Sequence, residues 1–280
     1  MSGEDSRKLR IMGIFAHPHD CVHALGTCGN HVRDGDSVTF VMLTGGTATH
    51  NEQLLHELRK APEDRDQAVL QQTSEQYVEQ KEAEVRKACG YFGITDLVVF
   101  DNDDHPLRRS QEMVEGLANL ISEYRPNILI GELPALLRED RLWTTPDDHT
   151  TCAEITKEAC LMAGHPRRED DRRPHTATRM YYLATERSYD NIDLYVDVSD
   201  HFENLIKAEA CFQSQAQSRE FAEARVTRTT GNTGWRAHVL AAEGFVRGDR
   251  IVNDRLIFTE HDYRRAGESA LDARKWLLGK

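Results

Sequence analysis

The sequence contains no apolar run that approaches the ~18 residues needed for a membrane-spanning helix. Its first ten residues, MSGEDSRKLR, lack the apolar segment of a signal peptide. The six cysteines form no C-x-x-C pair, and without a secretion signal they are expected to be reduced thiols. We therefore predict a cytoplasmic protein that has no membrane span and no framework of disulfides.

Basic charge is also scarce, since 35 lysine and arginine residues face 47 aspartate and glutamate residues, for a net charge of -12. No block of basic residues stands out, which argues against binding of nucleic acid or of an anionic membrane surface. The 280 residues, 39% of them hydrophobic, suffice for a sizeable core. We expect a single domain over residues 1–280, with a core in 1–163 and further strands and helices in 179–280.

Short apolar runs alternate with helix-favouring segments through the first half of the chain. The predicted strands are Leu9–Ala16, Ser37–Thr44, Asp96–Phe100 and Asn127–Ile130. The predicted helices are Ala24–Arg33, much of Glu52–Gly90, Arg109–Tyr124 and His149–Met162. This alternation is typical of an α/β protein with a mostly parallel sheet and helices on both of its faces.

The last hundred residues are expected to add an α+β elaboration to this sheet. The predicted strands there are Arg179–Ala184 and Leu194–Val198. The predicted helices are His201–Ser214 and Trp235–Val246, and the glycine-containing stretch Thr229–Gly234 before the second of them is predicted to be a flexible loop.

Polar residues follow three of the predicted strands. His17 to Asp20 comes after the first strand, Gly45-Gly46 after the second and Asp101 to His105 after the third. The carboxyl ends of parallel strands meet at one edge of a sheet, and ligands bind at that edge in α/β proteins. The topology alone therefore predicts that these three segments converge.

The stretch His17-Pro18-His19-Asp20 has the donor types and the spacing of a metal site. Residues 17 and 20 are three apart, so on a tight turn that enters a helix both side chains can point at one spot. His149 begins a predicted helix at the same edge and is the best candidate for a third donor. Two histidines and a carboxylate with an open position are typical of catalytic zinc. Spacing alone leaves open whether these are ligands or ordinary polar residues, and ordinary roles are expected for His23, His31, His50 and His56.

The segment AHPHDCVHALGT resembles the AHPDDE signature of the LmbE-like, or GlcNAc-phosphatidylinositol de-N-acetylase-like (PIG-L), metal-dependent deacetylases. Further segments between Leu9 and Arg247 are similar to that family in the same order, namely DNDDHPL, PDDHTTC, VDVSDHFENLIKAEACFQSQ and GWRAHVLAAEGFVR. The last of these resembles the final helix of the family. The resemblance implies a Rossmann-like fold and a single LmbE-like domain.

Carried over residue by residue, the resemblance implies that His17, Asp20 and His149 are the zinc ligands. Asp148 matches the aspartate that precedes the third ligand, and is expected to serve catalysis by orienting an imidazole. Asp104 matches an aspartate that contacts the substrate in the family.

The chain departs from the family pattern at residues that handle protons. The family's catalytic base is an aspartate at the position of His19, and its signature ends in a glutamate where this chain has Cys21. The histidine that begins the family's second signature is replaced by Pro146, and an expected substrate-side arginine by Lys81. His238 is a candidate for the missing donor to the substrate. His19 itself is able either to take up a proton near neutral pH or to join the metal as a fourth ligand, and the sequence does not decide between these roles.

Two functions from different classes follow from these residues. The first is a zinc-dependent hydrolase of the de-N-acetylase type, which cleaves an N-acyl amide, in the first place N-acetyl, on an amino sugar or a related small polar substrate, with His19 as a changed general base. The second is a metal-binding family member with lost or altered catalysis that serves as a binding or partner subunit. A nucleotide-binding Rossmann protein is disfavoured, since no G-x-G-x-x-G follows the first strand.

Zinc is the expected cofactor, and iron or manganese are the alternatives for a site of two histidines and one aspartate. The expected partner is a small N-acylated sugar, and the amphipathic helices leave a homo-oligomer open. The polar segment 52–76 is expected to be either a lid over the pocket or an oligomer contact.

Overall fold

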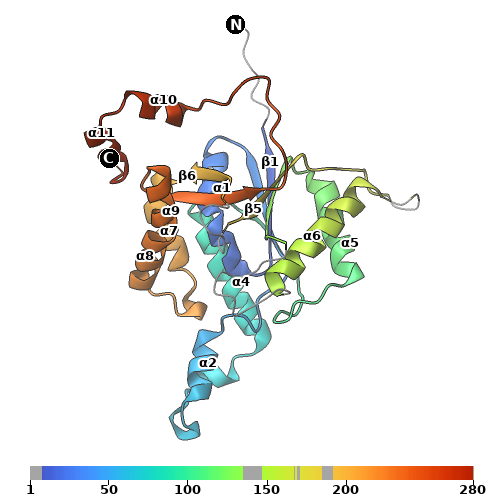
Figure 1. The fold of residues 1–280 in the computed structure, drawn as a ribbon. Helices are drawn as coiled ribbons and strands as arrows, with labels where there is room; N and C mark the ends of the chain where they lie inside the picture. Colours follow the sequence, from blue (N-terminus) through green and yellow to red (C-terminus); the bar gives the residue numbers. More distant parts are fainter. Residues whose placement is uncertain (1–7, 135–146, 167, 169–170, 185–191, 280) are drawn as a thin grey trace.

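A seven-stranded sheet forms the centre of the molecule in the computed structural model, which describes residues 8–134, 147–166, 168, 171–184 and 192–279 (Figure 1). The strands are β1 (Arg10–Phe15), β2 (Ser37–Met42), β3 (Asp96–Val99), β4 (Ile128–Gly131), β5 (Arg179–Leu183), β6 (Leu194–Asp197) and β7 (Ala242–Arg247). Their order across the sheet is β3-β2-β1-β4-β5-β7-β6. The first five strands in this order pair in parallel, whereas β7 is antiparallel to both β5 and β6. The prediction of an α/β fold with a mostly parallel sheet is confirmed.

Helices cover both faces of the sheet (Figure 1). The α-helices are α1 (Leu25–Arg33), α2 (Glu52–Arg59), α3 (Gln67–Gln71), α4 (Ser74–Gly90), α5 (Gln111–Tyr124), α6 (Asp148–Gly164), α7 (Phe202–Glu209), α8 (Arg219–Arg228), α9 (Thr230–Ala237), α10 (Glu260–Gly267) and α11 (Ala270–Trp276). Short 3₁₀ turns are η1 (Pro18–His23), η2 (Pro62–Asp64), η4 (Ser199–His201) and η5 (Gln213–Gln215).

The two faces of the sheet contribute to two hydrophobic cores, and β1 supplies side chains to both. Ile11 and Phe15 pack with α1, α4 and α7, whereas Met12 and Ile14 pack with α5 and α6. Because successive side chains of a strand point to opposite faces, a strand buried on both sides reads as an unbroken apolar run. This is why the run from Leu9 to Ala16 was recognisable as a central parallel strand.

The helices that position the polar edge begin at capping residues. The side chain of Asp147 accepts the backbone N–H of Thr150 at 2.9 Å, and that of Ser110 accepts the N–H of Met113 at 3.1 Å. Such caps satisfy N–H groups that have no partner inside a helix. The Asp147 cap starts α6 so that His149 lies in its first turn, close to the sheet edge.

The structure corrects the sequence prediction near the C-terminus. Thr230–Ala237 is helix α9 rather than part of a loop, and it ends at His238, whose φ is 60°. Ala242–Arg247 is strand β7, so the predicted helix Trp235–Val246 is wrong. This short segment becomes a strand because it pairs on both sides, with β5 and with β6, and those long-range partners are not visible in a local pattern.

Two helical segments extend from the central body (Figure 1). The polar segment 52–76 folds into α2, η2, α3 and the first turn of α4, and Gln53 Nε2 donates to the carbonyl of Gln213 at 3.4 Å. At the C-terminal end, Arg264 lies 3.7 Å from the centre of the Trp276 ring, which joins α10 to α11. No helix in the described part of the chain is both long and apolar enough to cross a membrane.

Candidate metal centre

The turn after β1 brings His17 and Asp20 together. His17 lies just before η1, where its backbone N–H donates to Oδ2 of Asp20 at 2.8 Å and its carbonyl accepts the N–H of Asp20 at 3.2 Å. This closed turn, with Pro18 in its first position, places the Nδ1 atom of His17 3.2 Å from Asp20 Oδ2. The two side chains, three residues apart in the sequence, therefore point toward each other, as the sequence suggested.

The imidazole of His149 approaches the same carboxylate from the start of α6. Its Nδ1 atom lies 3.8 Å from Asp20 Oδ2, and its ring centre lies 5.4 Å from that of His17. One donor atom from each of His17, Asp20 and His149 lies within 4.8 Å of the others. In a tetrahedral zinc site, donors at ~2.1 Å from the ion are ~3.4 Å from one another. His149, which is 129 residues after Asp20, thus completes with His17 and Asp20 a donor set whose chemistry and spacing suit one divalent cation.

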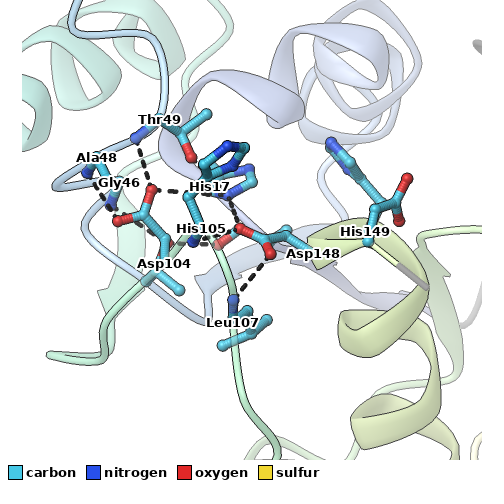
Figure 2. Close-up of polar contacts among 12 residues, drawn as sticks. His17, Gly46, Ala48, Thr49, Asp104, His105, Leu107, Asp148 and His149 are labelled. Atoms are coloured by element: carbon cyan, nitrogen blue, oxygen red, sulfur yellow. Dashed lines mark hydrogen bonds and ion pairs between the residues drawn. The ribbon is translucent and has the colours of Figure 1, made fainter. Parts of the chain in front are cut away.

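Asp148 orients the ring of His17, not that of its neighbour His149. The Nε2 atom of His17 lies 3.1 Å from Asp148 Oδ2, which also accepts the N–H of His105 at 2.8 Å. The other carboxylate oxygen accepts the N–H of Leu107 at 2.8 Å (Figure 2). Because Nε2 is engaged by Asp148, Nδ1 is the nitrogen of His17 that is left for a metal.

Asp104 is buried and its carboxylate is occupied by a loop after β2. It accepts hydrogen bonds from Thr47 Oγ1 at 2.6 Å and from the N–H groups of Ala48 and Thr49, each at 2.8 Å (Figure 2). The hydroxyl of Thr49 in turn lies 3.2 Å from Nε2 of His17. In this geometry the carboxylate of Asp104 supports the loop that forms one wall of the site.

The side chain of Lys81 binds the backbone of the same loop. Its ammonium group is fully buried and donates to the carbonyls of Gly46 at 2.9 Å and Thr49 at 3.0 Å. Burial, opposed by the charges of nearby carboxylates that include Asp104, lowers the pKa of Lys81 to about 8. Lys81 thus holds the backbone of residues 46–49, and its nitrogen is engaged by carbonyl groups.

His19, at the position of the family's base, is turned toward α7. Its Nε2 atom lies 2.8 Å from Glu209 Oε2, and its ring packs edge-on against Phe212 with the ring centres 4.7 Å apart. Burial would raise the pKa of Glu209, but the positive charges of His19 and Arg225 hold it below its ordinary value. Among the described residues, His19 belongs to no group of side chains spaced to bind a metal.

Glu132 is a residue of this site that sequence reasoning missed. It directly follows β4, it is 5% exposed, and its Oε2 atom lies 3.4 Å from Nδ1 of His149. Its other oxygen is buried and has no hydrogen-bond partner within the part of the chain that the structure describes. Burial raises the pKa of Glu132. Its place after a central strand was the available signal, since the other polar segments of the site were found by the same rule.

His238, the candidate for the missing donor to the substrate, is not part of the three-residue donor group. His238 is exposed at the end of α9, and no hydrogen bond or ion pair between described residues joins it to the three metal-site side chains. Pro146 lies outside the described residues. Cys21 is buried and its thiol donates to the carbonyl of Pro18 at 3.2 Å. For His50, which was expected to have an ordinary role, burial lowers the pKa. The charges of His19, Lys81 and His17 lower it further, and that of Asp20 raises it.

The charges in the cluster favour protonated imidazoles when no metal is present. Burial lowers the pKa values of His17 and His149, but the neighbouring carboxylates outweigh it and raise them to about 9 and about 10. The pKa of Asp20 is well below its ordinary value, because the two imidazoles outweigh the effect of its own burial. A metal ion that enters this site would displace these protons, so its binding releases protons to the solvent.

Comparison with known proteins identifies a family match over the part of the chain that holds this cluster. The model of a family described as GlcNAc-PI de-N-acetylase, PIG-L, matches residues 12–160, which is 149 of the 280 residues and includes His17, Asp20 and His149. The match supports a de-N-acetylase type of function, which is the hydrolysis of an amide. No curated protein sequence matched the chain.

Several solved structures share the fold. The 4-carboxy-2-hydroxymuconate hydratase GalB from Pseudomonas putida KT2440 is 18% identical, with a TM-score of 0.70 over 89% of this chain and 100% of its own. The N,N'-diacetylchitobiose deacetylase from Pyrococcus horikoshii is 18% identical, with a TM-score of 0.68 over 86% of this chain and 84% of its own. A conserved protein from Thermus thermophilus is 20% identical, with a TM-score of 0.66 over 88% of this chain and 97% of its own.

Proposed function

Because the chain belongs to the PIG-L family of GlcNAc-PI de-N-acetylases, we propose that it is a zinc-dependent hydrolase that removes an acyl group, in the first place acetyl, from the nitrogen of an amino sugar or a related small polar molecule. The observation that carries this proposal is the convergence of His17, Asp20 and His149 within 4.8 Å at the carboxyl edge of the sheet. Two imidazoles and one carboxylate leave a position free for water or substrate, as in catalytic zinc sites.

His17 Nδ1, a carboxylate oxygen of Asp20 and a ring nitrogen of His149 are the atoms that would hold the ion. The ion would supply a Lewis acid, which polarises a carbonyl oxygen and makes water a stronger acid near neutral pH. Asp148 keeps the His17 ring in the orientation that ligation needs, through the 3.1 Å contact with Nε2. Lys81 and Asp104 hold the loop of residues 46–49 against this ring.

His19 is the residue that we assign to proton transfer. It takes the proton of the attacking water as the new C–O bond forms, and it gives that proton to the nitrogen as the C–N bond breaks. The products are a carboxylic acid and an amine, which ionise to a carboxylate and an ammonium ion, so water is the only further reactant. Two observations support this assignment over that of a fourth ligand. Among the described residues, His19 is in no group of donors spaced to hold a metal, and its Nε2 atom is engaged by Glu209 at 2.8 Å.

The donor cluster is polar and is partly exposed to solvent. The side chains of His149 and His50 are 41% and 58% exposed, so a polar molecule can reach the cluster from solvent. The description of the family and the activity of the Pyrococcus horikoshii relative are both de-N-acetylations of N-acetylated sugars. A small N-acetylated sugar is therefore the first substrate to test.

The test is hydrolysis of a panel of N-acetylated mono- and disaccharides by zinc-loaded protein, followed as release of acetate. We expect activity in wild type and its loss in His17→Ala. His31→Ala is the matched control, because His31 pairs with Asp36 at 2.8 Å and lies outside the metal cluster. Absence of acetate release by the zinc-loaded wild type from every member of the panel would contradict the proposed reaction.

A metal-binding member with lost or altered catalysis is the second candidate, and one observation favours it. The usual basic aspartate is His19, and the fold is shared with a protein named as a hydratase, so the frame is compatible with a reaction other than amide hydrolysis. His19→Asp separates the two candidates. If wild type is inactive and His19→Asp releases acetate, the altered-catalysis candidate is favoured, whereas loss of a wild-type activity in His19→Ala supports the hydrolase.

A further inference from the structure

Three ionisable side chains from distant parts of the chain, His19, Glu209 and Arg225, contact one another in series next to the metal-site turn. His19 Nε2 lies 2.8 Å from Glu209 Oε2, and Arg225 Nε lies 3.1 Å from the other oxygen, Glu209 Oε1. His19 and Glu209 are each 5% exposed, and the side chain of Arg225 is 30% exposed. The series of contacts therefore runs from the turn that carries the metal ligands, through α7, to α8 near the surface.

Both oxygens of Glu209 are committed by these contacts. One faces the histidine and the other faces a guanidinium, which stays charged at any pH that the protein tolerates. A carboxylate that is buried and paired in this way keeps its position, because breaking either contact would leave an unpaired charge in the interior. Glu209 is consequently a fixed hydrogen-bond acceptor for whichever group of His19 faces it.

Packing leaves the His19 ring little freedom to turn. Phe212, on the same segment as Glu209, meets the ring edge-on at 84° with the ring centres 4.7 Å apart. His17 and Asp20, which lie on either side of His19 in the sequence, are themselves fixed by the closed turn after β1. A ring that swung toward the metal residues would lose both the Phe212 contact and the Glu209 contact.

We propose that Glu209, held in place by Arg225, is the positioning residue that sets the ring orientation and the tautomer of His19. In the neutral ring the Nε2–H group of His19 donates to Glu209, so the lone pair is on Nδ1, which makes no hydrogen bond within the described chain. Nδ1 is then the atom that accepts the proton of the attacking water. The inference rests on the proposed function only in that last step, and the placement of the proton on the ring is independent of it.

The pair accounts for the changed residue in the metal-site signature. An aspartate at position 19 would need no orienting partner, whereas an imidazole has two nitrogens, and only one tautomer offers a lone pair on the required side. A carboxylate that fixes the tautomer of a catalytic histidine is used for the same purpose in serine hydrolases. The histidine at position 19 and the glutamate at position 209 therefore act together.

The experiment is ¹⁵N NMR of uniformly ¹⁵N-histidine-labelled protein, with and without zinc, in wild type, Glu209→Gln and Arg225→Met. The His19 signals are assigned by their loss in His19→Ala. We expect the neutral form of the wild-type His19 ring to carry its proton on Nε2, and Glu209→Gln to give a mixture of the two neutral tautomers. Glu84→Gln is the matched control, because Glu84 is also buried and bonded, at 2.6 Å to the hydroxyl of Ser214, and should leave the His19 signals unchanged.

A kinetic comparison adds a readout that a merely structural role would not move. If the wild type hydrolyses the N-acetyl panel, Glu209→Gln should lower kcat by about 10²-fold or more, because part of the His19 population would then be in the tautomer and orientation that cannot act as a base, with KM and zinc affinity little changed. Arg225→Met, at a partly exposed position that tolerates change more readily, should shift the tautomer in the same direction. A neutral wild-type His19 ring with its proton on Nδ1, or a tautomer ratio that does not change in Glu209→Gln, would overturn the proposal. Inactivity on the panel with the expected tautomer would refute the hydrolase assignment and leave the positioning role standing.

Discussion

The Nε2 atom of His17 lies 3.1 Å from Oδ2 of Asp148, although 131 residues separate the two in the sequence. This contact couples the turn after β1 to the first turn of α6 and decides which nitrogen of His17 remains for a metal. It also ties in the segment after β3, since the same carboxylate accepts the N–H groups of His105 and Leu107. Three separate segments at the polar edge of the parallel sheet are thus joined through one side chain.

Asp148→Asn is expected to weaken zinc binding by about 10–100-fold, which is the usual effect of removing a carboxylate that orients a metal-bound histidine. The amide of asparagine would place an N–H₂ group toward one of the donors that Asp148 now accepts. Isothermal titration with zinc, or competition with a chelator, measures the change. Asp36→Asn is the control, since it disrupts the 2.8 Å contact of Asp36 with His31 away from the metal cluster. Equal affinities in Asp148→Asn and wild type would show that the contact does not serve metal binding.

Glu132→Gln is expected to lower zinc affinity by about tenfold or more, because Glu132 Oε2 lies 3.4 Å from the Nδ1 atom of His149 and helps to fix that ring. The substitution keeps the shape of the side chain and removes its charge. The measurement is again zinc competition, with Glu84→Gln as a buried carboxylate whose loss should leave affinity as it is. An unchanged zinc affinity in Glu132→Gln would show that Glu132 does not contribute to metal binding.

Lys81→Met should destabilise the protein by about 2–4 kcal/mol, because the carbonyls of Gly46 and Thr49 would lose a buried donor. The loop of residues 46–49 should loosen, and the Thr49 contact with His17 with it. Urea unfolding gives the change in the free energy of unfolding. Hydrogen exchange at the amides of Ala48 and Thr49 shows whether the loss is local. Wild-type stability and unchanged exchange in Lys81→Met would contradict this role.

The stability difference between wild type and Lys81→Met should also depend on pH. Burial lowers the pKa of Lys81 to about 8 in the folded protein, against 10.5 in an unfolded chain. Between these values the unfolded chain binds more protons than the folded one, so the free energy of unfolding rises with pH for this group. The stability of wild type relative to Lys81→Met should therefore be constant below about pH 8 and increase as the pH rises from about 8 toward 10.5. Urea titrations of both proteins from pH 7 to pH 10 would reveal it, and a constant or falling relative stability would count against a buried, neutralisable lysine.

The sequence was enough to predict the parallel core and the three converging donors. Central parallel strands are buried on both faces and leave unbroken apolar runs, and the residues after them meet at one edge whatever the details of the helices. His17, Asp20 and His149 were found in this way, with support from the family resemblance. Glu132 obeyed the same rule, but a glutamate after a strand has no spacing partner in the sequence to mark it.

The contacts that orient the side chains and the loop around the site were not predictable. They come from elements that meet only in the folded chain. Glu209 reaches His19 from α7, 190 residues away, and no local pattern marks its target. The contacts of Asp104 and Lys81 with the loop after β2 could not be read from the sequence either, and their expected contact with a substrate stays a prediction. The segment that becomes β7 was predicted to be helical because its strand character depends on pairing with β5 and β6.

The central claim is that one divalent ion binds to His17, Asp20 and His149. Diffraction from zinc-soaked crystals at the zinc absorption edge tests it most directly. We expect one strong anomalous peak at ~2.0–2.2 Å from His17 Nδ1, an Asp20 oxygen and a ring nitrogen of His149, with the His19 ring still paired with Glu209. No peak at that position, or a peak that excludes His149, would contradict it.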